Sequence, residues 1–317
     1  MVEEADYHPA VDELKVFAPG TVANLGPGFD VLGLALEQPG DTVAVRRTGK
    51  PGIRIASIEG DAGALPWEPE KNTAGIAALE VLRRAGSREG VELNVTKGLP
   101  LGSGLGSSAA SAAAAAVGVN RLLGDPLTPL DVIACCVEAE AVVSGRHADN
   151  VAPAVLGGLV LVRTVDPLDV RRLPVPPELH IVVVTPVFEL STRVAREVLP
   201  DKVSMGTLVQ NSANLSALIH ALHSNDLELL GRALDDKIVT PARSPLIPGC
   251  DRVFEAARQA GALGSSISGA GPSVFALCAS KNRTDVVATA MRDAFSGAGL
   301  ASSSVVSPAD CPGARLV

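Results

Sequence analysis

Residues 100–108, PLGSGLGSS, constrain the fold of this chain more than any other stretch. Three glycines alternate with other residues and two serines follow them: Gly102, Gly104, Gly106, Ser107 and Ser108. The next residues, 109–123, are rich in alanine and strongly favour a helix. Glycine permits positive φ and leaves the backbone open to a ligand, and a helix N-terminus adds free N–H groups and a positive dipole end. The stretch therefore predicts an anion site, with phosphate favoured, and a helix capped by the hydroxyl of Ser107 or Ser108.

Two other kinds of phosphate loop are excluded by the residues around this one. No Lys-Ser or Lys-Thr pair follows the last glycine, as a Walker A loop requires. The glycines also lack the GxGxxG spacing of a dinucleotide-binding loop. The alternative without a ligand is a glycine-rich turn before a buried helix, but the coincidence of three glycines, two serines and a helix favours phosphate.

Length and composition limit the class of protein. A chain of 317 residues, 47% of them hydrophobic, can bury the cores of two domains. The net charge of -8 and the 3% of aromatic residues argue against a nucleic acid or an anionic membrane as partner. The five cysteines include no CxxC pair, so we expect reduced thiols and no zinc site. No apolar stretch reaches the ~20 residues of a spanning helix, and the acidic N-terminus lacks a signal core, so we expect a soluble intracellular protein.

The pattern of apolar residues predicts strands and helices in irregular alternation. Strands are expected over residues 15–18, 41–48, 53–58, 91–96, 158–163, 180–185, 264–268, 274–278 and 303–306. Helices are expected over residues 72–84, 109–123, 128–143, 193–198, 205–223, 227–234, 250–260 and 284–295. A glycine-rich loop is expected over residues 20–30. Because no regular βαβ repeat appears, we predict an α+β fold.

A proline-rich connection suggests where the chain divides. Four prolines lie between residues 167 and 177. We therefore expect a mobile tail over residues 1–13, a first domain that carries the phosphate loop over residues 14–175, and a second domain over residues 176–317.

The sequence GLGSSAA after a proline resembles the phosphate loop of the GHMP kinases, the family of galactokinase, homoserine kinase, mevalonate kinase and phosphomevalonate kinase. Five more stretches narrow the resemblance to the homoserine kinases, most closely those of the plant type: residues 18–34 (APGTVANLGPGFDVLGL), 145–158 (GRHADNVAPAVLGG), 191–200 (STRVAREVLP), 241–249 (PARSPLIPG) and 266–273 (SISGAGPS). The resemblance implies an N-terminal domain like domain 2 of ribosomal protein S5 and a ferredoxin-like C-terminal domain. It also implies a homodimer, in the plastid stroma if the source is a plant and otherwise in the cytoplasm.

The activity that the resemblance implies is transfer of the γ-phosphoryl group of ATP to the hydroxyl of L-homoserine, a step of threonine biosynthesis. Ten residues would bind the nucleotide: Asn72, Lys97, Pro100, Gly102, Ser103, Gly104, Leu105, Gly106, Ser107 and Ser108. Asn72 matches the asparagine that recognises adenine, and it can also cap the helix that follows. Lys97 precedes the loop and can either contact phosphate or face solvent at the end of a strand.

Magnesium is the expected metal, held by a serine hydroxyl and one carboxylate. By resemblance the serine is Ser108 and the carboxylate is Glu140. Glu138 is the alternative, because the spacing between Glu140 and His147 is one residue shorter than in some family members. Two glutamates two apart on a helix point to nearly opposite sides, so only one of them can face the metal.

The acceptor is expected to be a small zwitterion. The resemblance assigns six residues to it: Asn24, Asp30, His147, Arg196, Arg243 and Gly269. A carboxylate calls for arginine, whose planar guanidinium pairs with both oxygens, so Arg196 and Arg243 are expected to bind the substrate carboxylate. Asn24 and Asp30 would accept hydrogen bonds from the ammonium group, although Asp30 can instead hold the reacting hydroxyl. Gly269 lies in a glycine cluster that closes on the phosphate loop in the family and that can also be a simple turn.

No general base is assigned. Asn150 occupies the position of an aspartate base in some GHMP kinases, and asparagine cannot take a proton. The neighbouring Asp149 is expected to point elsewhere. We therefore expect Asn150 to contribute to catalysis by positioning and electrostatics, which a loose phosphoryl transition state allows. The alternatives are a GHMP kinase for another small alcohol, such as mevalonate or shikimate, and a catalytically silent family member that binds nucleotide.

Overall fold

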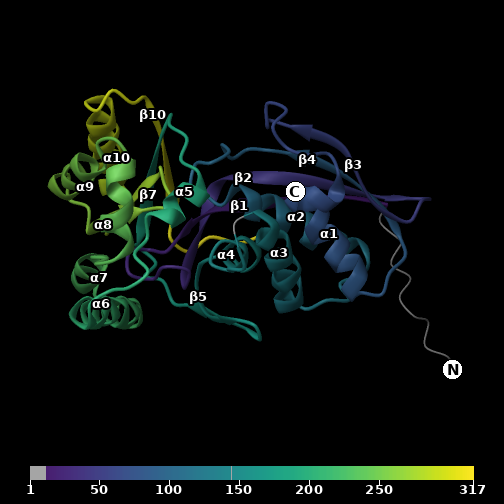
Figure 1. Cartoon of the computed structure of the whole chain (residues 1–317), viewed down its shortest axis with the longest axis horizontal. Helices are drawn as coiled ribbons and strands as arrows, with labels where there is room; N and C mark the ends of the chain where they lie inside the picture. Colours follow the sequence, from purple (N-terminus) through teal and green to yellow (C-terminus); the bar gives the residue numbers. More distant parts are fainter. Residues whose placement is uncertain (1–11, 144) are drawn as a thin grey trace.

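The computed structural model describes residues 12–143 and 145–317, so the predicted tail lies outside the described residues except for its last two. Two layered units follow one another along the long axis of the molecule (Figure 1). The first has a large sheet with helices on one face, and the second has a smaller sheet with helices on both faces. This mixture of mainly antiparallel sheets and helices confirms the predicted α+β class.

The large sheet of the described residues has seven strands, in the order β11-β1-β2-β4-β3, and β5 and β6 extend it from β2. The strands are β1 (Glu13–Ala23), β2 (Leu32–Thr48), β3 (Gly52–Glu59), β4 (Gly90–Thr96), β5 (Leu159–Val165), β6 (Leu168–Leu173) and β11 (Arg315–Leu316). All neighbours are antiparallel except β3 and β4. The first part of β2 pairs with β5 and its second part with β4, so one long strand connects both parts of the sheet.

The helices of the first unit cover one face of this sheet (Figure 1). They are α1 (Thr73–Arg84), preceded by the 3-10 turn η1 (Pro69–Lys71), α2 (Ser107–Leu122), α3 (Pro129–Val143) and α4 (Val151–Leu156). Helix α2 is central because its small side chains let the sheet and other helices approach closely, and 12 of its 16 residues are buried. At Gly118, for example, a Cβ atom would lie 2.9 Å from Cγ1 of Val45 in β2. The glycine-rich loop thus connects the end of β4 to a helix that is fixed on all sides.

The second unit has a four-stranded antiparallel sheet in the order β10-β7-β9-β8. Its strands are β7 (His180–Pro186), β8 (Gly264–Ile267), β9 (Val274–Cys278) and β10 (Ser302–Pro308). Helices α9 (Cys250–Gln259) and α10 (Lys281–Ser296) pack on one face, and α6 (Met205–Ser224) and α7 (Leu227–Ala233) pack on the other. Short elements stand between these: α5 (Thr192–Glu197), α8 (Val239–Arg243) and the 3-10 turn η2 (Ser244–Leu246).

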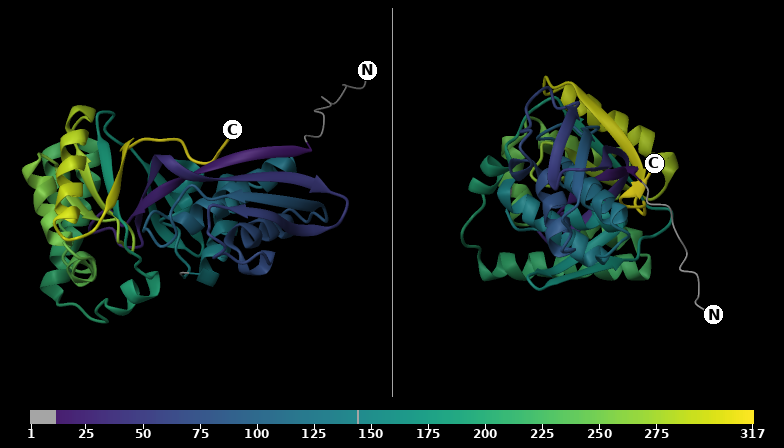
Figure 2. Two further views of the ribbon diagram at one scale, coloured as in Figure 1. Left: turned by 90° about the horizontal axis from the view of Figure 1, so that it is seen from above. Right: turned by 90° about the vertical axis from the view of Figure 1, so that its right-hand side faces the viewer.

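A shared apolar cluster holds the two units together. Leu32 and Leu34 of β2 belong to the same buried cluster as Ile181 and Val183 of β7 and Leu218 of α6. The chain also returns at its end, because β11 pairs with β1 in the first sheet, as the two views in Figure 2 show. The first sheet therefore contains residues from both ends of the described chain, and the domain boundary at residues 175 and 176 stays a prediction.

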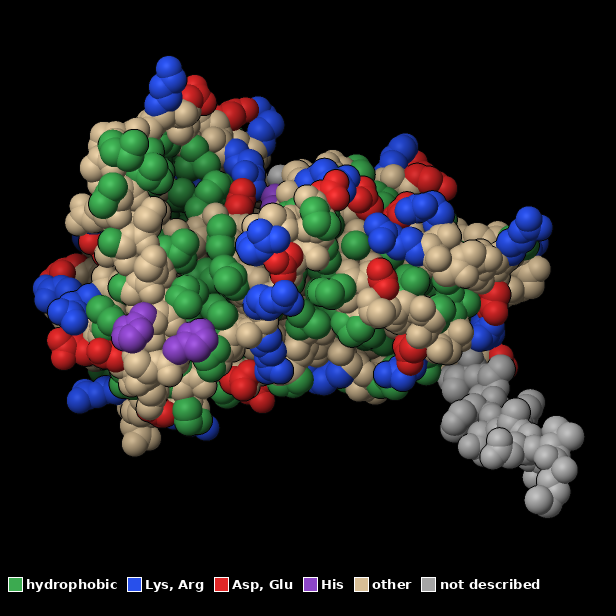
Figure 3. Space-filling model, turned by 90° about the horizontal axis from the view of Figure 1, so that it is seen from below, with side chains coloured by type: hydrophobic (Ala, Val, Ile, Leu, Met, Phe, Trp, Pro, Cys, Tyr) green, Lys and Arg blue, Asp and Glu red, His purple; other side chains and the backbone are tan. Residues whose placement is uncertain are grey.

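The face in Figure 3 carries Lys and Arg side chains interspersed with Asp and Glu, without one large basic area. In the described part of the chain no helix is long and apolar enough to cross a membrane. All five cysteines are buried free thiols.

Two kinds of expectation about local structure were wrong. The loop predicted over residues 20–30 begins only at Asn24, because β1 continues to Ala23 and pairs with β2 through Ala23 and Gly33. Six short elements were not predicted, namely η1, β6, α4, α8, η2 and β11. Each has at most six residues, too few for a periodic pattern to emerge.

Candidate active site

A cavity of about 410 Å³ lies where the two units meet. All but two of the residues expected to bind nucleotide, substrate or metal line it. The exceptions are Pro100, whose carbonyl accepts a hydrogen bond from the Ser103 hydroxyl at 2.8 Å, and Leu105, whose side chain is buried in the apolar cluster between the units. The structure thus brings together residues that are more than 200 positions apart in the sequence, such as Asn24 and Gly269.

Two of the three glycines of the loop, Gly104 and Gly106, meet backbone and side-chain atoms that leave no room for a larger residue. Gly102, Gly104 and Gly106 all have positive φ, at 63°, 79° and 65°. A Cβ atom on Gly104 would lie 2.6 Å from the carbonyl oxygen of Ser268, and one on Gly106 would lie 2.1 Å from Oγ1 of Thr21. Glycine is therefore required at these two positions both for backbone conformation and for space.

The expected serine cap of α2 was wrong. Gly106 is the N-cap residue, and no side-chain hydrogen bond caps the helix. Ser107 and Ser108 are instead its first two residues, and both line the cavity. The N–H groups of a first helical turn have no partner within the helix, so these backbone groups are directed to where an anion can bind.

The segment after β8 packs against the glycine-rich loop. The Ser268 hydroxyl donates to the carbonyl of Gly104 at 2.7 Å, and the Ser273 hydroxyl donates to the carbonyl of Ser103 at 2.6 Å. The Asn24 amide donates to the carbonyl of Gly269 at 2.9 Å. The last glycine cluster, 269–271, is thereby attached to the phosphate loop on one side and to the loop after β1 on the other.

Asn72 caps helix α1, as predicted. Its Oδ1 accepts from the backbone N–H of Ala74 at 3.0 Å, and its Nδ2 donates to the carbonyl of Pro66 at 2.9 Å. Leu65 and Pro66 also line the cavity and contribute apolar surface to it. The adenine contact of Asn72 stays a prediction.

Lys97 has neither of the surroundings expected for it. It does not face solvent: its side chain is 1% exposed and forms an ion pair with Asp41, whose side chain is fully buried. Its ammonium group also donates to the carbonyl of Ser107 and to the hydroxyl of Ser111, both at 2.8 Å. Its three N–H donors are therefore used inside the protein, and a direct contact with phosphate is not supported. Burial lowers the pKa of Lys97, and the charge of Asp41 opposes that shift.

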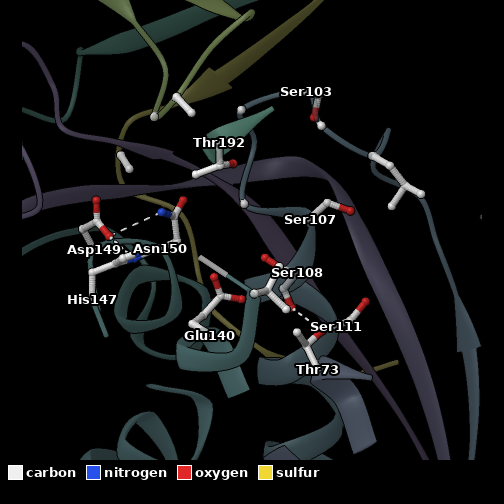
Figure 4. Close-up of a pocket in the computed structure, with 18 of the residues that line it drawn as sticks. Thr73, Ser103, Ser107, Ser108, Ser111, Glu140, His147, Asp149, Asn150 and Thr192 are labelled. Carbon is white, nitrogen blue, oxygen red and sulfur yellow. Dashed lines mark hydrogen bonds and ion pairs between the residues drawn. The ribbon is translucent and has the colours of Figure 1, made fainter. Parts of the chain in front are cut away.

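The two glutamates of α3 have different surroundings. Glu140 is buried and lines the cavity, and Figure 4 shows it with Ser108 on the wall formed by the helices. Glu138 lies outside the cavity lining and is paired with Arg146 at 2.7 Å and 2.9 Å. Of the two, only Glu140 can act together with Ser108 as a pair of oxygen donors. Among residues 12–143 and 145–317, no group of three or more His, Cys, Asp or Glu side chains could hold a metal ion.

Two arginines and one aspartate form the wall opposite the loop. Arg196 of α5 donates to both carboxylate oxygens of Asp30, at 3.0 Å and 3.2 Å. The guanidinium groups of Arg196 and Arg243 both lie over the ring of Phe29, 5.5 Å and 5.2 Å from its centroid. Arg243 is buried and donates to the carbonyls of Ala195 and Gly269. Its burial, together with repulsion from Arg196, lowers the pKa of Arg243 to about 10.

The expectation that Asp149 points elsewhere was wrong, because Asp149 is buried and lines the cavity. Its Oδ1 lies 3.2 Å from Nδ1 of His147, and it accepts from the Asn150 amide at 3.4 Å (Figure 4). Burial opposes the charge on His147, but the hydrogen bond and ion pair with Asp149 outweigh it and raise the pKa of the imidazole. The hydroxyl of Thr21 donates to Oδ1 of Asn150 at 2.8 Å and so orients its amide.

Thr21, Asp41 and Ser111 make hydrogen bonds in this region, but none of them was predicted from the sequence as a residue of the site. Asp41 stands at the start of a predicted strand and Ser111 is a polar residue in an alanine-rich helix. A polar residue in an otherwise apolar element is the only signal that could have indicated them.

Known proteins resemble this chain in sequence and in fold. Two sequence profiles match the chain: GHMP kinases N terminal domain over residues 72–158 and GHMP kinases C terminal over residues 218–297. The homoserine kinase of Arabidopsis thaliana is 47% identical, over 98% of this chain and 86% of that protein, and the homoserine kinase of Chlorobaculum tepidum is 45% identical, over 95% and 97%. A crystal structure of homoserine kinase from Cytophaga hutchinsonii superposes with a TM-score of 0.96 at 45% identity, over 99% of this chain and 100% of that one. A mevalonate kinase from L. major shares the fold alone, with a TM-score of 0.69 at 18% identity.

Proposed function

This chain belongs to the GHMP kinase family, and we propose that it is a homoserine kinase, which transfers the γ-phosphoryl group of ATP to the hydroxyl of L-homoserine and forms O-phospho-L-homoserine. One observation carries the proposal: a single cavity is lined on one side by the glycine-rich loop and on the other by Asp30 with Arg196 and Arg243. The first wall suits nucleotide phosphates, and the second suits a small zwitterion. The relatives that are 45% and 47% identical over nearly the whole chain support the same substrate.

We assign the ATP phosphates to the loop and to the first turn of α2. The positive-φ glycines and the unpaired N–H groups of the helix provide donors without a direct lysine contact. The donor set of Ser108 and Glu140 fits magnesium, because both are oxygen ligands on the wall of the same cavity. When bound, the ion would neutralise negative charge on the β- and γ-phosphates.

We assign the amino-acid end of the substrate to the opposite wall. Its carboxylate would pair with Arg196 and Arg243, and its ammonium group would donate to Asp30 and Asn24. Since Arg196 and Asp30 are paired with each other, the substrate would enter by exchanging partners: its carboxylate would replace Asp30 on Arg196, and its ammonium group would replace Arg196 on Asp30. Every charge would remain compensated during that exchange.

Transfer itself would depend on orientation. Two carboxylates that line the cavity have other partners, because Asp149 is paired with His147 and Asp30 with Arg196. Asn150 is held by Thr21 and can orient a substrate hydroxyl by hydrogen bonding. A loose phosphoryl transition state requires alignment and charge stabilisation more than a strong base.

The test is ADP release from ATP in the presence of magnesium, with L-homoserine as acceptor. L-Serine, L-threonine, mevalonate and shikimate are the comparison acceptors. We expect homoserine to be used with the highest kcat/KM, because mevalonate and shikimate have no ammonium group to pair with Asp30. Preference for mevalonate or shikimate would assign the chain to another GHMP kinase activity, and ADP binding without transfer to any acceptor would indicate a silent member. The homodimer stays a prediction that light scattering after size-exclusion chromatography would test.

A further inference from the structure

A buried ion pair lies directly beneath the phosphate loop and has no place in the chemistry above. Asp41 belongs to β2, and Lys97 follows the last residue of β4. Their side chains are 0% and 1% exposed. A buried charge pair costs desolvation free energy, so its hydrogen bonds with the surrounding chain should show what it does there.

Asp41 holds the start of the loop. Its Oδ1 accepts from the backbone N–H of Gly98 at 3.0 Å and from that of Leu99 at 3.2 Å. These are the two residues that immediately precede Pro100, where the glycine-rich stretch begins. The carboxylate therefore fixes the point at which the chain leaves β4.

The same carboxylate also holds the other end of the loop. Oδ2 of Asp41 accepts from the hydroxyl of Ser111 at 2.6 Å and from the ammonium group of Lys97. Lys97 in turn donates to the carbonyl of Ser107 and to the hydroxyl of Ser111. Ser107 and Ser111 are the first and fifth residues of α2, so the network joins both ends of the loop to one point on β2.

We propose that Asp41 is a positioning residue for phosphoryl transfer, which acts through Lys97 and Ser111 to hold the two ends of the loop at a constant separation. A stretch with three positive-φ glycines is intrinsically mobile, and ordering it when the nucleotide binds would reduce affinity. The clamp formed by Asp41, Lys97 and Ser111 keeps the loop ordered beforehand. This inference rests on the proposed function, since it assumes that the loop binds nucleotide phosphates.

Two variants remove the clamp in different ways. Ser111→Ala deletes one link and places alanine in a helix that is already rich in it. Asp41→Asn combined with Lys97→Met removes both charges, so that neither is left buried alone, and the asparagine oxygen can still accept from Gly98 and Leu99. The matched control is Glu92→Gln, which breaks the ion pairs of a buried glutamate with Arg46 and Arg54 on the same sheet but away from the loop.

Calorimetry with ADP and with adenosine separates the phosphate contribution from that of the base. We expect both clamp variants to bind ADP at least about tenfold more weakly than the wild type and to bind adenosine equally well. In turnover assays KM for ATP should rise while KM for homoserine stays unchanged. The Glu92→Gln variant should lose thermal stability without any change in the ratio of ADP to adenosine affinity.

Each outcome has one meaning. Equal ADP affinity in the wild type and in a folded clamp variant would refute the clamp and leave the proposed function standing. A parallel loss of ADP and adenosine binding would show a general structural role and also refute the clamp. A wild-type protein that binds no ADP would refute the proposed function itself. If the double variant does not fold, Ser111→Ala alone decides the question.

Discussion

Arg196 and Asp30 form a two-pronged ion pair across the wall of the cavity, with Nη–Oδ distances of 3.0 Å and 3.2 Å. The residues are 166 positions apart in the sequence and come from the two different units of the fold. Both side chains are about one-third exposed, so the pair is open to a small molecule. A partly exposed pair of opposite charges offers a partner to each charged end of a zwitterion, as the proposed substrate homoserine is.

Removal of Arg196 should impair the use of the acceptor without changing the binding of the nucleotide. We expect Arg196→Ala to lower kcat/KM for homoserine on the order of a hundredfold, because a carboxylate would lose a charged two-pronged partner. Arg196→Lys should retain only part of the wild-type kcat/KM for homoserine. KM for ATP should change little in either variant. Arg193→Ala is the matched control on the same helix, since Arg193 is exposed and pairs only with Glu197 among the residues described.

An acceptor without a carboxylate, 3-amino-1-propanol, completes this experiment. The wild type should use it poorly, and Arg196→Ala should cause little further loss with it. An equal loss with both acceptors would place Arg196 on the transferred phosphoryl group or on the fold instead.

Alanine substitution of the two glutamates of α3 should have very different effects on turnover. Glu140→Ala should abolish turnover at every magnesium concentration, because Glu140 lines the cavity with Ser108. Glu138→Ala should remain active, since it loses only a surface ion pair with Arg146, worth at most about 1 kcal/mol. Magnesium titration of the ATP-dependent rate is the measurement. Loss of activity in Glu138→Ala alone, or equal loss in both variants, would overturn the metal assignment.

Two loop glycines allow the effect of steric collision to be separated from the effect of positive φ. Gly104 and Gly102 both have positive φ, so alanine at either should cost ~1–2 kcal/mol of backbone strain. A Cβ atom at Gly104 would also collide with the carbonyl oxygens of Ser268 and Gly271, whereas no atom lies within 4 Å of one at Gly102. Gly104→Ala should therefore raise KM for ATP much more than Gly102→Ala. Similar values for the two variants would show that contact between the loop and residues 268–271 is unimportant.

His147 should make stability depend on pH. Because Asp149 raises its pKa in the folded protein above the usual 6.5, the stabilisation is fully present below about pH 6.5 and is lost as the pH rises through the raised pKa. In Asp149→Asn burial is opposed only by the more weakly acting charges of Asp30 and Glu140, so the pKa of His147 should fall. NMR titration of the imidazole, assigned with His147→Gln, measures both pKa values. Thermal unfolding between about pH 5 and 8 should show the largest deficit of the variant at the acidic end, and a constant deficit would contradict the pairing.

Local patterns in the sequence determined much of this protein. Alanine over residues 109–123 predicted the central helix, and the asparagine at position 72 predicted the cap of α1, because helix propensity and capping depend on residues within a few positions of one another. The glycine-rich stretch predicted a tight loop for the same reason. Even here the exact boundary required the structure, since Gly106 and not a serine is the N-cap of α2.

Tertiary packing decided which polar side chains face the cavity and which face one another. The sequence could not show that Lys97 is paired with Asp41, because partners separated by 56 residues become neighbours only when apolar clusters bring their strands together. Asp149 is close to His147 in the sequence, but only the packing of the surrounding elements turns its carboxylate into the cavity. The sequence restricted the candidate metal ligand to one of two glutamates, and the orientation of α3 against α2 placed Glu140 in the cavity and Glu138 at the surface. Periodicity determines the angle between side chains on one helix, but only burial of that helix against its neighbours determines which side is inside.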